Sequence, residues 1–85
     1  MKTTNLGTSN LQVSELCLGC MPFGARVSGG EVDALCDRFR EAGGNFFDTA
    51  HCYCFWVDGS DAGDSERELG RYVKSRGCRD EVIIA

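Results

Sequence analysis

Apolar and polar residues are arranged along the chain in a pattern that predicts alternating strands and helices. Leu11 and Val13 alternate with polar neighbours near the amino terminus, and the turn former Gly7 lies before them. Residues 3–16 are therefore predicted to form a β-hairpin. Residues 16–20, Leu-Cys-Leu-Gly-Cys, form a short and almost wholly apolar run, which is typical of a strand buried on both faces in a parallel sheet.

The segment after Ser28 predicts an amphipathic helix of about fourteen residues. Ser28 precedes Glu31 by three residues, which is the spacing of a capping box at the start of a helix. Apolar residues then recur at three- and four-residue steps: Val32, Leu35, Cys36, Phe39 and Ala42. Gly43 and Gly44 follow, and glycine favours the left-handed conformation in which many helices end.

A second strand, a second helix and a third strand complete the pattern. Residues 45–50 predict the second strand, and residues 81–85 predict the third because they contain β-branched Val and Ile. Ser65 and Glu68 repeat the capping-box spacing before a helix of about eleven residues, which Gly77 can end. Its apolar stripe is Leu69, Tyr72 and Val73. The order hairpin, β, α, β, α, β indicates an α/β fold with parallel strands.

Composition narrows the classes of function. With 85 residues, 42% of them hydrophobic and 26% charged, the chain is expected to form one small globular domain. A net charge of −4 without a cluster of Lys and Arg argues against binding nucleic acid. No apolar run approaches the roughly 20 residues of a membrane-spanning helix. Because the amino terminus lacks the apolar core of a signal peptide, we expect a cytoplasmic protein whose six cysteines stay reduced.

The candidate chemistry lies in residues 45–54, Asn-Phe-Phe-Asp-Thr-Ala-His-Cys-Tyr-Cys. In parallel α/β folds, ligands bind at the carboxyl ends of strands, and Asp48 is predicted at such an end. Because Asp48 follows two phenylalanines, we expect its carboxylate to lie partly buried and to need a cationic partner. Tyr53 lies five residues later, where a sharp turn after the strand would bring its phenol beside Asp48.

A phenol can donate a proton to a carbonyl oxygen while hydride arrives at the carbonyl carbon. Its ordinary pKa of about 10 is roughly three units too high for this role, which corresponds to about 4 kcal/mol. One ammonium group at about 4 Å supplies an interaction of about that size at an effective dielectric near 20. A lysine held by Asp48 is therefore the expected third member of the site.

These residues are part of a wider resemblance. Asp-Thr-Ala-His-Cys-Tyr, residues 48–53, resembles the Asp-Thr-Ala-x-x-Tyr motif of the aldo-keto reductases. Residues 6–24 resemble the opening hairpin, first strand and following loop of that family, residues 65–73 its second helix, and residues 79–85 the run into its third strand. Several ordered motifs at the spacing of one family are much more specific than any of them alone.

The resemblance implies the N-terminal part of a (β/α)8 TIM barrel whose N-terminal β-hairpin closes the bottom. It also implies NADPH as cofactor and a small-molecule carbonyl substrate, with aldehydes or ketones reduced to alcohols. By this resemblance Tyr53 is the general acid, and Asp48 orients the catalytic lysine near the cofactor. Gly19 and Met21 would lie near the nicotinamide and its ribose, and Trp56 would form a wall of the substrate pocket.

The chain departs from the family in its extent. A complete barrel takes about 250 residues, so residues 1–85 are expected to form a truncated N-terminal segment with about three of the eight strands. The resemblance places the catalytic lysine and histidine beyond Ala85, and we expect this chain alone to be inactive. Cys54 stands where many relatives have glycine after the tyrosine.

Two other classes of function stay open. Cys17 and Cys20, together with residues 51–54, offer ligands for a small cysteine-rich zinc-binding module. Residues three apart on a strand point to opposite faces, so Cys17 and Cys20 would converge on one metal ion only if the strand were broken. Cys17 and Cys36 are therefore interpreted as small core residues, and no metal site is predicted. His51 is interpreted as a loop or pocket-lining residue. The second alternative is a non-catalytic interaction protein whose open sheet edges pair with a partner.

Overall fold

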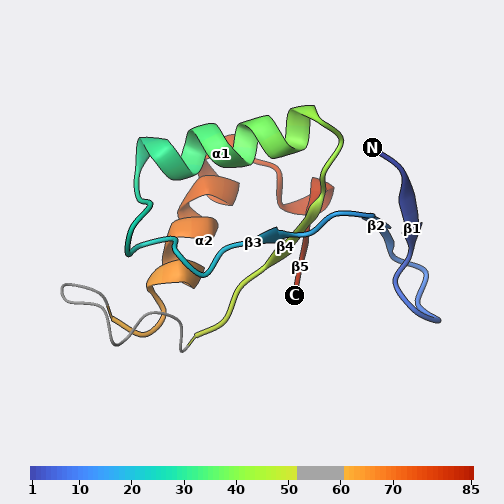
Figure 1. Ribbon diagram of the computed structural model, residues 1–85, viewed down its shortest axis with the longest axis horizontal. Helices are drawn as coiled ribbons and strands as arrows, with labels where there is room; N and C mark the ends of the chain where they lie inside the picture. The colour runs from blue at the N-terminus through green and yellow to red at the C-terminus, as the bar shows by residue number, and fades with distance from the viewer. Residues whose placement is uncertain (52–60) are drawn as a thin grey trace.

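The computed structural model describes residues 1–51 and 61–85, and the predicted site residues Tyr53 and Trp56 lie outside them. Figure 1 shows the order of the elements. The strands are β1 (Thr3–Asn5), β2 (Gln12–Ser14), β3 (Leu18–Gly19), β4 (Phe46–Asp48) and β5 (Ile83–Ile84). The helices are α1 (Gly30–Glu41), α2 (Asp64–Arg76) and the short 3-10 helix η1 (Arg79–Glu81). Neither α1 nor α2 is long and apolar enough to cross a membrane, judged on the described ranges.

The strands form two sheets, as the sequence predicts. β1 and β2 pair antiparallel as the hairpin, and β3, β4 and β5 form a parallel sheet in that order. α1 connects β3 to β4, and α2 lies between β4 and β5 in the chain, so the two connections have the β-α-β form. The predicted mixed α/β architecture with parallel strands is therefore confirmed.

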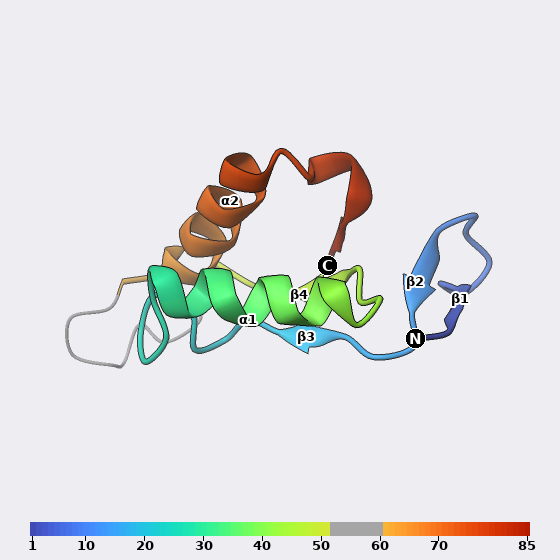
Figure 2. The ribbon, with the colours of Figure 1, turned by 90° about the horizontal axis from the view of Figure 1, so that it is seen from above.

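The hairpin is attached to the amino-terminal end of the parallel sheet through Asn45. The Ser14 amide donates to Asn45 Oδ1 at 2.7 Å, and the Asn45 amide donates to Ser14 Oγ at 3.1 Å. Asn45 Nδ2 also donates to the carbonyl oxygen of Gln12 at 2.9 Å. Figures 1 and 2 show the hairpin beyond this end of the sheet, away from α2. It therefore lies at the end of the sheet opposite the carboxyl ends of the strands.

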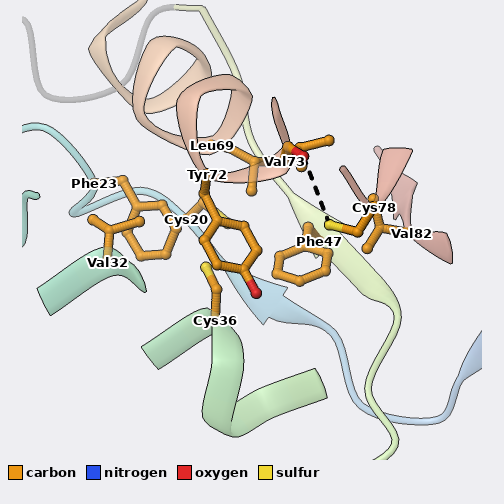
Figure 3. Close-up of a cluster of buried hydrophobic side chains, with 10 residues drawn as sticks. All are labelled: Cys20, Phe23, Val32, Cys36, Phe47, Leu69, Tyr72, Val73, Cys78 and Val82. Carbon is orange, nitrogen blue, oxygen red and sulfur yellow. Dashed lines mark hydrogen bonds between the residues drawn. The ribbon is translucent and has the colours of Figure 1, made fainter. Parts of the chain in front are cut away.

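The hydrophobic core lies between the parallel sheet and the two helices (Figure 3). Phe47 from β4 is fully buried, and its ring meets that of Phe39 from α1 edge to face, with centroids 5.3 Å apart. The other buried members of the core are Cys20, Phe23, Val32, Cys36, Leu69, Tyr72, Val73, Cys78 and Val82. The stripe Leu69, Tyr72 and Val73 predicted for the second helix is confirmed as buried.

A polar network at the edge of this core joins α1 to α2. The Tyr72 hydroxyl donates to Asp37 Oδ1 at 2.6 Å, and Arg76 Nη2 donates to Asp37 Oδ2 at 2.8 Å. The hydrogen bonds from Arg76 and Tyr72 lower the pKa of Asp37 to about 2. Burial raises the pKa of Tyr72 to about 12. The network therefore favours a charged Asp37 and a neutral Tyr72 in the folded protein.

The prediction of two capping boxes is wrong. The residues that precede the helices are Gly29 before α1 and Gly63 before α2, with φ angles of 57° and 87°, and neither helix has a side-chain cap. Ser28 contributes its backbone carbonyl, which accepts from the Glu31 amide at 3.2 Å. Ser65 lies inside α2, where its hydroxyl bonds to another segment. The helices have 12 and 13 residues, and Gly77 ends α2 in the left-handed conformation as predicted.

The apolar stripe predicted for the first helix is only partly correct. Val32 and Cys36 are buried, but Leu35 is 41% exposed and Ala42 is also exposed. Leu35 lies in an open groove beside the edge strand β3, lined by Leu18, Leu35, Arg38, Phe39, Glu41 and Ala42. This flank of α1 is exposed because β3 ends the sheet on that side and no described element packs there.

Candidate functional site

The carboxyl ends of β3 and β4 bring two predicted site residues together. Gly19 and Asp48 are paired in the parallel register, and the Cys20 amide donates to the Asp48 carbonyl at 2.8 Å. Side chains alternate between the faces of a strand. Because Phe47 points into the core beneath the helices, Asp48 and Gly19 belong to the opposite face. We call this face, which carries Gly19, Phe46 and Asp48, the open face.

The expectation that Asp48 lies partly buried is wrong, because the structure places it exposed. The two preceding phenylalanines do not enclose it, since only Phe47 is fully buried and the open face has no covering layer in the described chain. No described Lys, Arg or His forms an ion pair with the Asp48 carboxylate. Lys2 precedes β1 and Lys74 lies on α2, so neither lysine of the sequence belongs to this strand end.

The backbone at the end of β3 is unobstructed at Gly19. A Cβ atom built on Gly19 would have no heavy atom within 4 Å, and Met21 is 49% exposed just beyond the strand. An absent side chain at Gly19 permits close approach to the backbone, and the Met21 thioether offers an adaptable apolar surface. With the Asp48 carboxylate alongside, this edge combines an unobstructed backbone, an apolar side chain and a hydrogen-bond acceptor.

Cys17 and Cys20 differ in their surroundings. Cys17 is exposed, which corrects its interpretation as a core residue, whereas Cys36 is buried as predicted. Desolvation and the Asp48 carboxylate both raise the pKa of the Cys17 thiol. Cys20 is fully buried beneath the helices, and burial raises its pKa to about 12. Within residues 1–51 and 61–85, no group of three or more His, Cys, Asp or Glu is placed to hold a metal ion.

A pair of hydroxyl groups behind the strand ends was missed by the sequence reasoning. Ser65 is only 1% exposed, and its Oγ lies 2.6 Å from the Cys20 carbonyl oxygen and 2.6 Å from Thr49 Oγ1. The sequence contains a signal for this role. Ser65 precedes Leu69 by four residues and Tyr72 by seven, so it is a polar residue within the buried stripe of α2.

His51 lies just beyond the strand end and is exposed, as expected for a loop residue. Its Nδ1 is 3.1 Å from Glu66 Oε1 in the first turn of α2. The predicted general acid Tyr53 and pocket residue Trp56, together with Cys52 and Cys54, lie outside the described residues. Their predicted roles, and the distance between Tyr53 and Asp48, stay predictions.

Comparisons with known proteins agree on one family. Residues 15–85 match the family model described as the Aldo/keto reductase family. The chain is 44% identical over 84 residues to norsolorinic acid reductase stcV of Emericella nidulans, covering 91% of this chain and 20% of that protein. It is 36% identical to the uncharacterized oxidoreductase YrpG of Bacillus subtilis, covering 99% of this chain and 25% of that protein.

A shorter relative matches over most of its length. The uncharacterized 11.2 kDa protein in the crtE 3' region of Pseudescherichia vulneris is 33% identical over 85 residues, which cover 99% of this chain and 82% of that protein. By contrast, the chain spans only about a fifth of the length of the norsolorinic acid reductases that it matches.

Proposed function

Because the chain belongs to the aldo/keto reductase family, we propose that it provides part of the active site of an NADPH-dependent oxidoreductase that reduces aldehydes or ketones to alcohols. In this proposal residues 1–85 form the N-terminal hairpin and the first three of eight strands of a (β/α)8 barrel. The open face becomes the inside of that barrel, where strand carboxyl ends carry the chemistry. The catalytic lysine and histidine then come from chain outside these residues.

One observation carries the proposal. The register of β3 and β4 pairs Gly19 with Asp48 at the carboxyl edge of a parallel sheet, on the face without helices. A carboxylate and an unobstructed backbone at this edge suit the ribose and nicotinamide of a dinucleotide. The exposed position of Asp48 also leaves its carboxylate free to bind an ammonium group from another strand.

In the proposed reaction, bound NADPH supplies the hydride that adds to the carbonyl carbon. Tyr53 donates its phenolic proton to the carbonyl oxygen, and Trp56 forms part of the substrate pocket. The phenol needs a nearby cation to lower its pKa from about 10. Asp48 holds that cation, the lysine, in place. Because no lysine of this sequence lies at the strand end, the isolated chain should not turn over substrate.

A chimera tests this function. Residues 1–85 would replace the matching segment of norsolorinic acid reductase stcV, which supplies the remainder of a family member. We expect NADPH oxidation that depends on an added aldehyde or ketone. Tyr53→Phe should lower kcat at least about a hundredfold, since general acid catalysis contributes about 10²–10⁴. Asp48→Asn should lower kcat similarly by releasing the lysine.

Matched variants control for effects on folding. Tyr72→Phe also removes a phenolic hydroxyl, but from the network between the helices, and Asp80→Asn removes an exposed carboxylate of η1. Both should retain kcat within about twofold, since neither residue lies at the open face. A chimera in which Tyr53→Phe or Asp48→Asn remains fully active would contradict the proposed roles. Robust turnover of a reactive aldehyde by the isolated chain would contradict the need for an external lysine.

A further inference from the structure

We propose that Thr49 and Ser65 are positioning residues, whose hydroxyl groups fix the carboxyl ends of β3 and β4 relative to each other and so set the spacing between Gly19 and Asp48. We call the hydrogen bonds that join Thr49, Ser65 and the Cys20 carbonyl the hydroxyl relay. Its geometry does not depend on which ligand the site binds. Its consequence for catalysis rests on the function proposed above.

The direction of each hydrogen bond in the relay follows from its chemistry. The Cys20 carbonyl oxygen can only accept, so Ser65 Oγ, 2.6 Å away, donates its single proton to it. The Ser65 hydroxyl then has only lone pairs left for Thr49. Thr49 must therefore donate to Ser65 Oγ across their 2.6 Å contact. The relay runs from Thr49 through Ser65 to Cys20.

This relay acts on the two residues that directly follow the site residues in the chain. Cys20 follows Gly19, and Thr49 follows Asp48. The Cys20 amide already donates to the Asp48 carbonyl, and the Thr49 amide donates to the Ala85 carbonyl at 3.1 Å. One serine from the first turn of α2 therefore links both strand ends, and in the sequence Thr49 and Ser65 flank the segment that contains Tyr53.

Burial makes the relay hard to replace. Ser65 is 1% exposed and Cys20 is fully buried, so water cannot readily take over a lost hydrogen bond. The Cys20 carbonyl also accepts from the Phe23 amide at 3.1 Å, so loss of Ser65 removes one of its two donors and also removes the acceptor of the Thr49 hydroxyl. Buried hydrogen bonds that are lost without replacement are costly. Loss of the Ser65 hydroxyl should therefore loosen the carboxyl ends of β3 and β4 in particular.

Amide hydrogen exchange of the 85-residue chain, followed by NMR, tests the local effect. Ser65→Ala should speed exchange of the Cys20 and Thr49 amides by about tenfold, in line with the loss of a buried hydrogen bond. The Ile83 amide, which bonds to the Asn45 carbonyl at 2.7 Å at the other end of the sheet, should change less than threefold. Equal acceleration of all three amides would mean general unfolding and would overturn the proposal.

The chain offers matched controls. Ser75→Ala removes a hydroxyl from the same helix, where it donates to the Tyr72 carbonyl at 2.8 Å, and should leave the Cys20 and Thr49 amides unchanged. Thr49→Val removes the first donor while keeping the side-chain shape, and should have a smaller effect than Ser65→Ala because the bond to Cys20 remains. Thr49→Ser keeps the hydroxyl and should behave as the unchanged chain. If Ser65→Ala fails to fold, exchange of the Cys20 and Thr49 amides is compared between Thr49→Val and Thr49→Ser. Equal exchange rates in these two variants would overturn the proposal.

Kinetics of the chimera separate positioning from simple stabilisation. Ser65→Ala should raise KM for NADPH and lower kcat per folded molecule by about tenfold. Thr49→Val should change both in the same direction by a smaller factor, and Thr49→Ser should restore both. Unchanged kcat and KM in folded Thr49→Val and Ser65→Ala would leave only a structural role and overturn the inference. A chimera without any reductase activity would contradict the proposed function instead, and the exchange measurements would still test the relay.

Discussion

The two faces of the parallel sheet differ in what they bury and what they expose. The helix-covered face carries Phe47 and Cys20, both fully buried, and both helices pack against it. The open face carries Gly19 and Asp48, both exposed, and no described element covers it. In this chain, one face supplies the hydrophobic core and the other presents the polar groups of the site.

The difference shows how one short strand can serve the hydrophobic core and a candidate site at the same time. Burial on one face orders the strands, and the pleat of each strand then directs alternate side chains to the other face. Asp48 and Phe47 illustrate this, since they are neighbours in β4 with opposite surroundings. Substitutions on the helix-covered face should therefore affect mainly folding, and substitutions on the open face should affect mainly the chemistry of the site.

The largest expected effect is loss of the folded state at high pH. Burial raises the pKa of Cys20, Cys36 and Tyr72 to about 12 each. In the unfolded chain these groups lose their protons near pH 9 for cysteine and pH 10 for tyrosine. The stability they contribute is complete below pH 9 and is lost as pH rises toward 12. Circular dichroism under reducing conditions should show unfolding across this range.

Variants of single cysteines show which face of the sheet causes the loss of stability at high pH. Cys36→Ala removes one buried titrating group and should make stability depend less steeply on pH above 9. Cys17→Ala should change this dependence less than Cys36→Ala does, because Cys17 is exposed. A chain that remains folded at pH 12, or an equal effect of the two variants, would contradict the assignment of the alkaline transition to the helix-covered face.

The next largest effect is on the free energy of unfolding, and it should differ between two adjacent phenylalanines of β4. Phe47→Ala should lower the free energy of unfolding by about 3–5 kcal/mol, because it leaves a cavity in the core and removes the contact with Phe39. Phe46→Ala should cost about 1 kcal/mol, since the Phe46 side chain is only half-buried. Urea denaturation measures both. Costs that differ by less than about 1 kcal/mol would show that the two faces contribute alike to stability.

Much of the fold could be predicted because local patterns determine it. The apolar stripe of α2 and the glycine at its end correspond to observed features, since packing and glycine geometry follow directly from residue type. The exposure of Leu35 could not be predicted in this way. Helical periodicity shows which residues share a stripe, but the edge position of β3 decides whether a neighbouring element covers that stripe.

The candidate site could also be predicted only in part. The position of Asp48 at a strand end follows from the sequence, but its exposure depends on whether another element covers the open face, and no described element does. Ser65 was interpreted as a helix cap because capping patterns are local. Its contact with the Cys20 carbonyl joins residues 45 positions apart, and only the packing of α2 against the end of β3 creates it.

The smallest expected effect concerns the thiols of the two faces. In a chain with Cys52→Ser and Cys54→Ser, a thiol reagent should label Cys17 first, because Cys17 is exposed while Cys20, Cys36 and Cys78 are buried. The buried thiols should react only on unfolding, at rates that urea increases. Cys17→Ser should change the free energy of unfolding by less than about 0.5 kcal/mol, as for most surface substitutions. Mass spectrometry of the labelled chain identifies the modified residue. Labelling of Cys20 as fast as Cys17 would show that the helices do not protect their face of the sheet, and the contrast between the faces would fail.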